Sequence, residues 1–193
     1  MRLAAPLCVL LLCATAFAAA PSKPVPHAAA KKPAKPVLDE LFARLAKAET
    51  TEDAHPIEDQ IFALFEQSGS ASVDLLMTRG AAALAAGDDD TAKKLFDAIT
   101  QVAPNFAEGW HQKAQLQAEN GDDEGAMVSL ERAVTLNPRQ FAAMSQLGDL
   151  LEEYGNKDGA LKLYKRVLAL DPQFEDAAKH VRVLEKDVEG QGI

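Results

Sequence analysis

The sequence predicts an all-α protein built from stacked helical hairpins, and three sets of regularly spaced residues carry that prediction. Prolines recur at an interval of 34 residues, at Pro104, Pro138 and Pro172. Glycines followed by Asp or Asn recur at the same interval, at Gly87, Gly121 and Gly155. Small residues followed four positions later by a large one form a third set, Ala92, Ala126 and Ala160. A fixed period of this length is typical of proteins that stack one supersecondary unit many times.

The spacing inside each unit indicates two antiparallel helices. The apolar residues of "LKLYKRVLAL", from Leu161 to Leu170, have helical spacing and do not alternate as a strand would. A small residue on one helix lets its partner approach closely, and the large residue one turn away fills the remaining space. Glycine followed by a short polar residue ends one helix and begins the next. Proline then closes the second helix, since its ring disfavours the helical conformation of the preceding residue.

Residues 1–18 have the pattern of a secretory signal peptide. Arg2 precedes an apolar run from Leu3 to Ala20, and Ala16-Phe17-Ala18 offers the small-x-small pattern of a cleavage site after Ala18. The alternative is an uncleaved membrane anchor, because the run approaches the length of a spanning helix. Both cysteines, Cys8 and Cys13, lie in this segment. Cleavage would therefore leave no thiol for a disulfide, a thiolate metal site or a nucleophile.

Residues 19–36 have the composition of a disordered linker. They contain prolines every few positions, four lysines and no acidic residue, so they cannot bury a core and are expected to form an extended spacer. The part of the chain from Val37 onward holds 15 of the 20 Lys and Arg residues and all 29 Asp and Glu residues, a net charge of −14 (15 minus 29). The basic spacer either stays solvated or lies on an anionic membrane or cell-wall polymer.

Three consecutive units resemble the tetratricopeptide repeat, whose 34-residue pattern is W-x₂-L-G-x₂-Y, then A-x₃-F, then P. They cover residues 73–106, 107–140 and 141–174, which we call repeats 1, 2 and 3. Repeat 3 matches best, with Met144, Leu147, Gly148, Leu151, Ala160, Tyr164 and Pro172. Repeats 1 and 2 depart from the pattern at Arg79 and Ala83, and at Lys113 and Gln117. The resemblance implies a right-handed superhelical stack of antiparallel hairpins.

The segments on either side of the repeats are expected to cover the two ends of the stack of repeats. Residues 37–72 continue the register through Phe42, Ala46 and Phe62 but break it at Glu58 and Ser70, so we expect a degenerate capping hairpin. Residues 175–193 have apolar residues on one face and charges on the other, which predicts a helix that caps repeat 3.

The resemblance also implies a binding surface, because the first helix of each repeat lines the concave side, where partner segments lie in tetratricopeptide proteins. On this register the inward positions are Asp74, Met77, Thr78, Ala81, Glu108, His111, Gln112, Gln115, Ala142, Ser145, Gln146, Asp149, Lys179 and His180. Family members that hold acidic chaperone tails use Lys, Arg and Asn at such positions, whereas these are mostly neutral or acidic. We therefore expect a protein partner whose segment is neutral, apolar or basic. The acidic residues could also serve only to keep the protein soluble.

No residue pattern in the chain predicts catalysis or a cofactor. The four histidines, His27, His55, His111 and His180, have no metal-ligand spacing. Acidic runs such as Asp88 to Asp90 fall at expected helix starts, where they complement the helix dipole, and they lack the spacing of a calcium loop. No phosphate loop, nucleophile elbow or dinucleotide fingerprint occurs. Because the body is strongly acidic, nucleic acid is an improbable partner.

These features favour a non-catalytic, exported scaffold of a bacterial type that binds another protein in the periplasm through its concave groove. The alternative is a membrane-tethered accessory subunit of an envelope biogenesis or translocation complex, held by an uncleaved N-terminal helix. An enzyme would need a carboxylate of the groove, such as Asp149, to act on a substrate.

Overall fold

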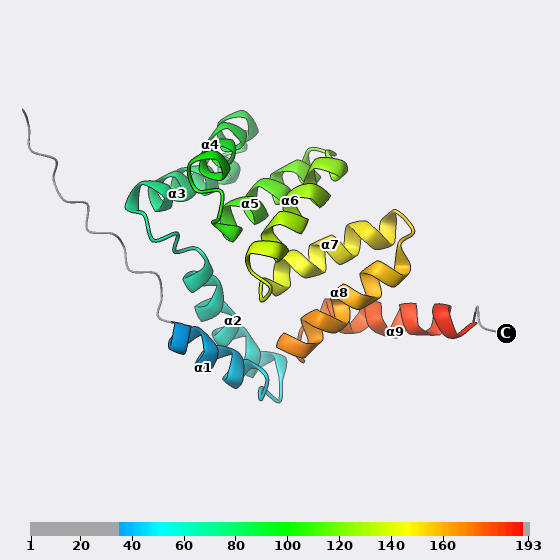
Figure 1. The fold of residues 1–193 in the computed structure, drawn as a ribbon. Coiled ribbons are helices and arrows are strands. Elements are labelled where there is room, and N and C mark those ends of the chain that lie inside the picture. The colour runs from blue at the N-terminus through cyan, green and yellow to red at the C-terminus, as the bar shows by residue number, and fades with distance from the viewer. Residues whose placement is uncertain (1–34, 191–193) are drawn as a thin grey trace, which may run out of the picture.

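The computed structural model describes residues 35–190, with side chains described through Lys186. This range contains helices and turns but no strand (Figure 1). The predicted signal peptide and nearly all of the predicted linker lie outside it. The helices are α1 Lys35–Leu45, α2 Thr51–Phe65, α3 Ala71–Ala85, α4 Asp89–Val102, α5 Ala107–Glu119, α6 Asp123–Leu136, α7 Phe141–Glu153, α8 Lys157–Leu170 and α9 Glu175–Gly190.

Each repeat is a helical hairpin whose turn is fixed by glycine and a capping residue. Gly87, Gly121 and Gly155 have φ of +71°, +74° and +81°, a conformation that side chains with a Cβ rarely adopt. The next residue then caps the second helix: the side chains of Asp88, Asp122 and Asn156 accept hydrogen bonds from the backbone N–H three positions on. The column of glycines in the sequence therefore marks the points where the chain reverses.

Close approach of the two helices follows from the small residues in the sequence pattern. A Cβ added to Gly80 would lie 2.6 Å from the ring of Phe96, and one added to Gly148 would lie 2.7 Å from the ring of Tyr164. The alanines of the second helices, Ala92, Ala126 and Ala160, are fully buried. The predicted pairing of small and large residues is thus confirmed by the packing of α3 on α4 and of α7 on α8.

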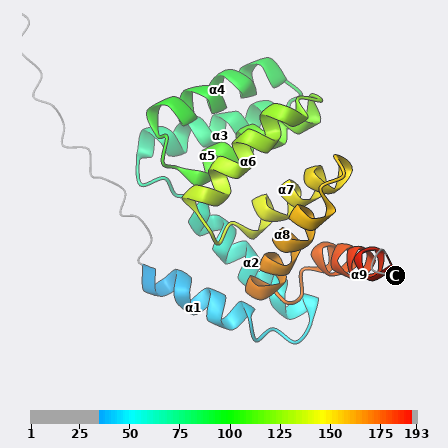
Figure 2. The same cartoon turned by 45° about the vertical axis from the view of Figure 1, so that its right-hand side comes forward.

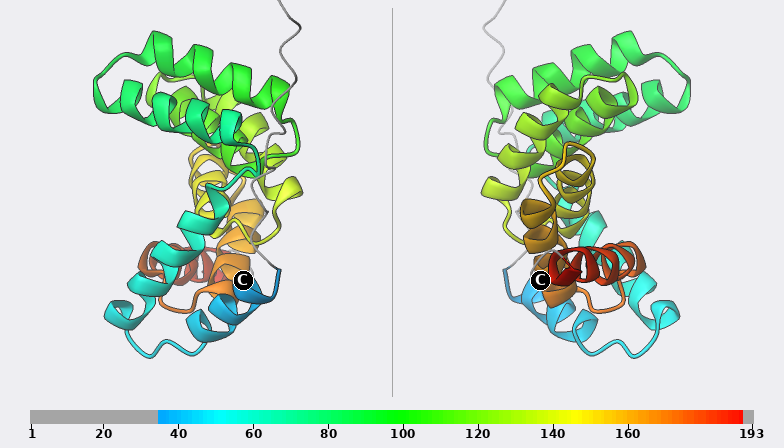
Figure 3. Two further views of the ribbon diagram at one scale, coloured as in Figure 1. Left: turned by 90° about the vertical axis from the view of Figure 1, so that its left-hand side faces the viewer. Right: turned by 90° about the vertical axis from the view of Figure 1, so that its right-hand side faces the viewer.

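The last helix covers the end of the stack as predicted. Ala177 and Leu184 of α9 are fully buried, and α9 packs along α8. Lys165 of α8 and Glu185 of α9 form an ion pair of 2.8 Å at the edge of this contact. Figure 3 shows α3–α4 and α9 at opposite ends of the curved stack, with α7 and α8 between them.

The N-terminal segment forms a hairpin, but its place differs from the expected cap on repeat 1. α1 and α2 pack on one another, whereas α2 makes no extended contact with α3 or α4. In Figures 1 and 2 the hairpin lies beside α8 and the start of α9, and α2 leads back from there to α3. The buried residues of α1 and α2 belong to the core of repeats 2 and 3, while repeat 1 has a separate small core.

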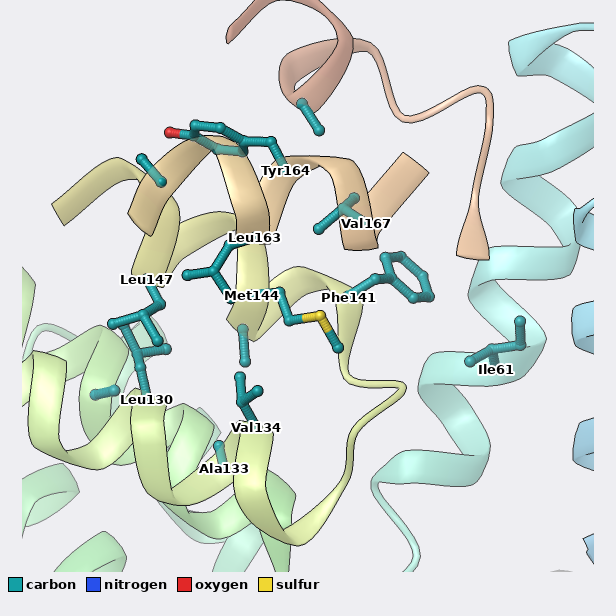
Figure 4. Close-up of a cluster of buried hydrophobic side chains, with 14 of the residues drawn as sticks. Ile61, Leu130, Ala133, Val134, Phe141, Met144, Leu147, Leu163, Tyr164 and Val167 are labelled. Atoms are coloured by element: carbon teal, nitrogen blue, oxygen red, sulfur yellow. The ribbon is translucent and has the colours of Figure 1, made fainter. Parts of the chain in front are cut away.

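An aromatic cluster attaches this hairpin to repeat 3. Phe141, at the start of α7, is fully buried (Figure 4). Its ring centroid lies 5.0 Å from that of Phe62, 6.3 Å from that of Phe42 and 5.8 Å from that of Phe174. Arg139 lies over the ring of Phe42 and pairs with Asp39 at 2.7 Å. The sequence register did not predict this contact, because the register only places a hairpin next to its neighbours in the chain.

Candidate functional site

A hollow of about 520 Å³ opens between α7 and α9. The helices that form it are fixed by the burial of Met144 on one side and Ala177 on the other. It is lined by Ala142, Ser145, Gln146, Asp149, Glu152, Glu153, Phe174, Asp176 and His180. We call this the α7–α9 hollow.

The α7–α9 hollow is acidic, and its one basic group is tied to two of its carboxylates. The Nδ1 atom of His180 lies 2.8 Å from Glu152, and its Nε2 atom lies 3.8 Å from Asp149. The Tyr164 hydroxyl donates to Asp149 at 2.7 Å, and the Tyr164 ring stacks on His180 with centroids 4.7 Å apart. Glu153 and Asp176 bring two further carboxylates to the lining, so the hollow favours positive charge.

Partial burial raises the pKa of two groups at this hollow, Asp149 and Tyr164. The pKa of Asp149 is raised, mainly because burial disfavours its charged form, although the Tyr164 hydroxyl and His180 oppose this effect. The pKa of Tyr164 is also raised, first by burial and then by the hydrogen bond to Asp149. Tyr164 therefore keeps its proton and holds the Asp149 carboxylate in place.

Two of the predicted inward positions of repeat 2 are closed. Glu108 and His111 are buried, and the Glu108 carboxylate accepts hydrogen bonds from the side-chain amides of Gln112 and Gln140. The His111 ring lies 3.4 Å from Glu108, and its Nε2 atom is buried without a hydrogen-bond partner. The last turn of α2 brings Glu66 near Glu108, so this stretch of the concave side is covered by the chain itself.

Two smaller hollows divide the remaining concave positions. One, of about 300 Å³, lies between the end of α2 and α3 and is lined by Ala63, Glu66, Gln67, Asp74, Met77, Thr78, Ala81 and Gln112. The other, of about 270 Å³, is lined by residues that include Gln115, Gln146 and Asp149. The predicted inward positions therefore lie along adjoining hollows: Gln146 and Asp149 line both the α7–α9 hollow and the hollow of Gln115, while the end of α2 lines the hollow beside α3.

Two family models described as tetratricopeptide repeat match the chain, one over residues 73–116 and one over residues 117–182. Together they span more than half of its 193 residues. The chain is a tetratricopeptide repeat protein. Proteins of this family commonly act as scaffolds for protein interactions.

A curated relative and several solved structures resemble this tetratricopeptide repeat protein. A TPR repeat-containing protein of Rhizobium etli is 29% identical over 85 residues, which cover 44% of this chain and 42% of the relative. The chain thus matches about two fifths of that relative's length. The first TPR of Spaghetti (RPAP3), bound to the HSP90 peptide SRMEEVD, has a TM-score of 0.56 at 21% identity, with coverage of 61% of this chain and 93% of that one.

Two further structures show the same fold. The Sgt2 TPR domain of Aspergillus fumigatus has a TM-score of 0.56 at 20% identity and covers 62% of this chain and 81% of its own. A mutant O-GlcNAc transferase of Thermobaculum terrenum has a TM-score of 0.53 at 25% identity, covering 59% of this chain and 22% of its own. Tetratricopeptide repeats thus also occur within enzymes, although the family is generally non-catalytic.

The residues predicted to face inward in this tetratricopeptide repeat protein do not all line one hollow. Ser145, Gln146, Asp149 and His180 line the α7–α9 hollow, and Glu108 and His111 are closed off. The hollow beside the end of α2 is lined by Asp74, Met77, Thr78 and Gln112, and Gln115 lines the third hollow. Lys179 is exposed, and its side chain donates a hydrogen bond to Asp176 of the same helix at 3.2 Å. It is not among the residues that line the α7–α9 hollow. The prediction did not include four residues that line this hollow, Glu152, Glu153, Phe174 and Asp176. Asp176 could have been found, since it lies 34 positions after Ala142 and 68 after Glu108 in the same column.

The described residues form neither a membrane-spanning helix nor a metal site. Within residues 35–190, no helix is long and apolar enough to cross a membrane. The same part of the chain contains no group of three or more His, Cys, Asp or Glu side chains arranged to hold a metal ion.

Proposed function

We propose that this protein is a non-catalytic scaffold that binds a segment of a partner protein in the α7–α9 hollow. The observation that carries the proposal is the open, acidic lining of that hollow. Glu153 and Asp176 are exposed there and Asp149 is half-buried, next to the apolar surface of Ala142 and Phe174. A concave surface that combines apolar area with a few placed charges is suited to binding a ligand.

The partner segment is expected to be basic, or neutral with an apolar anchor. A Lys or Arg side chain in the hollow would face carboxylates on both walls, and complementary charge increases both the specificity and the rate of association. The Spaghetti (RPAP3) structure holds the peptide SRMEEVD. Three of the last four residues of that peptide are acidic. Such a peptide would be repelled by the four carboxylates of this hollow.

The arrangement of His180 supports a binding role rather than a catalytic one. Its two ring nitrogens face Glu152 and Asp149, so neither is directed at a serine, threonine or cysteine nucleophile as nucleophilic catalysis requires. The pairing instead fixes α9 against α7 and shapes the hollow.

The proposed location is the periplasm, with the sequence of residues 1–18 as its support. If those residues stay attached, the protein is instead a membrane-tethered accessory subunit of an envelope biogenesis or translocation complex. The apolar run from Leu3 to Ala20 is close to the length that a spanning helix needs. Sequencing the N-terminus of the protein from cell fractions decides between the two: a soluble form that begins at Ala19 supports the periplasmic scaffold.

The binding proposal is tested with a charge reversal in the hollow and a matched reversal elsewhere. The hollow variant is Glu153→Lys with Asp176→Lys, and the control is Glu131→Lys with Asp158→Lys, two exposed residues on α6 and α8. Both variants change the net charge equally. Each protein is titrated by fluorescence anisotropy against basic, neutral and acidic peptides, with SRMEEVD among the acidic ones.

We expect basic peptides to bind the unmodified chain and the control, and to lose at least about tenfold in affinity for the hollow variant. A tenfold loss of affinity corresponds to about 1.4 kcal/mol of binding free energy, and the removal of close charge pairs between the peptide and the hollow is expected to cost at least that much. Equal binding by both variants, or preference of the unmodified chain for the acidic peptide, would show that the α7–α9 hollow is not the site.

A further inference from the structure

Three helices of the stack, α5, α7 and α9, each pack on the second helix of the preceding hairpin, which is α4, α6 or α8. On α5 the residues of this contact include Gly109, Lys113 and Leu116. A Cβ added to Gly109 would lie 2.6 Å from Ile99 of α4. The Lys113 ammonium lies 2.7 Å from Asp97 of α4, and Leu116 is buried in the core of repeat 1. We call these three positions, and the equivalent three of each first helix and of α9, the stacking face.

The stacking face is covered in α5, α7 and α9 but open in α3. Counted in steps of 34 residues, its positions are Ala143, Leu147 and Leu150 in α7, Ala177, Val181 and Leu184 in α9, and Leu75, Arg79 and Ala82 in α3. The positions in α7 and α9 are buried or half-buried, whereas all three in α3 are exposed. Leu75 is 51% exposed, although its equivalents Ala143 and Ala177 are fully buried.

The stacking face of α3 is open because the hairpin that precedes it in the chain packs elsewhere. α2 makes no extended contact with α3, and its Phe62 lies against Phe141 of repeat 3, with ring centroids 5.0 Å apart. Figure 3 shows α3 and α4 at one end of the stack. The end units of repeat proteins usually present a polar outer face, whereas this end presents Leu75 and Ala82.

Arg79 indicates which charge a covering helix would carry. Its equivalent on α5, Lys113, pairs with Asp97 of the preceding helix. Arg79 pairs with no carboxylate among the residues whose side chains the structure describes. An acidic residue at the place of Asp97 on a covering helix would therefore meet Arg79. The helix α2 does not supply it, because its residue in that column is Ala63.

Leu75 indicates the size of the residue that would lie opposite it. On α5 this position is Gly109, and it faces the large side chain of Ile99. On α7 it is Ala143, and the register sets Ala133 of α6 opposite, where both alanines are fully buried. The residue on the covering helix thus becomes smaller as the residue on the stacking face becomes larger, as close packing requires. Opposite Leu75 a small residue is expected.

We propose that the stacking face of α3 binds an amphipathic helix of a partner protein, which takes the place of the second helix of a preceding repeat. This helix places an apolar stripe on Leu75 and Ala82, a carboxylate beside Arg79, and a small residue two positions after that carboxylate. Helices bind grooves and faces of other proteins through such stripes. The stacking face of α3 contains no residue of the α7–α9 hollow, so this surface does not depend on the function proposed for that hollow.

A second copy of this chain fits the stacking face of α3 less well. The 15-residue helix α3 is about 22 Å long and 10 Å wide. It offers a few hundred Å², which is less than the roughly 800 Å² per partner of a stable dimer. Two α3 helices packed face to face would also leave both Arg79 side chains unpaired, because none of the three positions of the face is acidic.

Fluorescence anisotropy on the full chain tests the proposal with a labelled peptide of the α6 sequence, residues 122–136. This sequence has Glu131 followed two positions later by Ala133, which is the order that Arg79 and Leu75 require. A hydrocarbon staple on the side away from Glu131 keeps the peptide helical, since a free peptide of this length is marginally helical. The second probe is the same peptide with Glu131→Lys. Each is titrated with the unmodified chain, with Arg79→Glu and with a control, Lys94→Glu, at an exposed position of α4.

We expect the peptide with Glu131 to bind the unmodified chain and the control equally, and to bind Arg79→Glu at least about tenfold more weakly. The Glu131→Lys peptide should prefer Arg79→Glu to the unmodified chain, a reversal that a misfolded variant would not produce. The absence of saturable binding to the unmodified chain up to about 1 mM peptide, or equal losses in Arg79→Glu and the control, would overturn the proposal. Sedimentation of the same proteins tests the other occupant: a dimer that Arg79→Glu dissociates would assign the face to a second copy and would also overturn it.

Discussion

The packing of α7 on α8 requires that no side chain be present at Gly148, and Gly148→Ala tests this requirement. A Cβ there would lie 2.7 Å from Cε1 and 2.9 Å from Cζ of the Tyr164 ring, whereas ordinary contacts of a Cβ begin at 3.4 Å. The ring or the helix would have to move by about 0.7 Å, the difference between 3.4 Å and 2.7 Å.

The Tyr164 ring is poorly placed to make that movement. It is fully buried, its hydroxyl donates to Asp149 at 2.7 Å and it stacks on His180. Overpacking of this kind costs about 1–3 kcal/mol, while the better helix propensity of alanine offsets about 1 kcal/mol. Since burial, a hydrogen bond and a stacking contact hold the ring, we expect a net loss of roughly 1–2 kcal/mol in the free energy of unfolding.

Thermal unfolding followed by circular dichroism measures this loss. For a domain of this size, a loss of 1 kcal/mol lowers Tm by about 2–4 °C, so G148A should melt about 2–8 °C below the unmodified chain. The control is Glu131→Ala, a change to alanine at an exposed position of α6. We expect that change to leave Tm unchanged or to raise it. If G148A melted as high as the unmodified chain, α7 and α8 could not approach as closely as the structure shows.

Two further substitutions test the repeat register and the attachment of the hairpin. Ala126→Leu should cost about 1–3 kcal/mol, because Ala126 is fully buried in the core of repeats 2 and 3, and an unchanged Tm would contradict the register. Phe141→Ala should cost about 3–5 kcal/mol and should lower the hydrogen-exchange protection of α1 and α2 more than that of α3 and α4. Val102→Ala, at an exposed position, is its control and should change Tm little. Equal loss of protection in all four helices would show that Phe141 does not hold the hairpin.

The structure brings together only some of the positions that the register places inward, because the register says nothing of contacts between distant parts of the chain. The register placed Ser145, Gln146 and Asp149 on the lining of the α7–α9 hollow. It could not show that Glu108 and His111 are closed off, since that depends on side-chain amides and on a helix from another part of the chain. Gln140, which donates to Glu108, lies 32 positions away from it in the sequence.

The sequence by itself determined the three repeats, because the residues that form them act locally. Each feature that shapes a repeat works within a few positions of the chain: the glycine with positive φ, the N-cap three residues before its donor, and the proline after the last turn. The period of 34 residues then repeats these features. Only the tertiary structure decided where the N-terminal hairpin lies. The contacts that hold it join residues such as Asp39 and Arg139, 100 positions apart. No local pattern encodes such a pairing: it depends on which apolar and charged surfaces remain after the repeats have stacked.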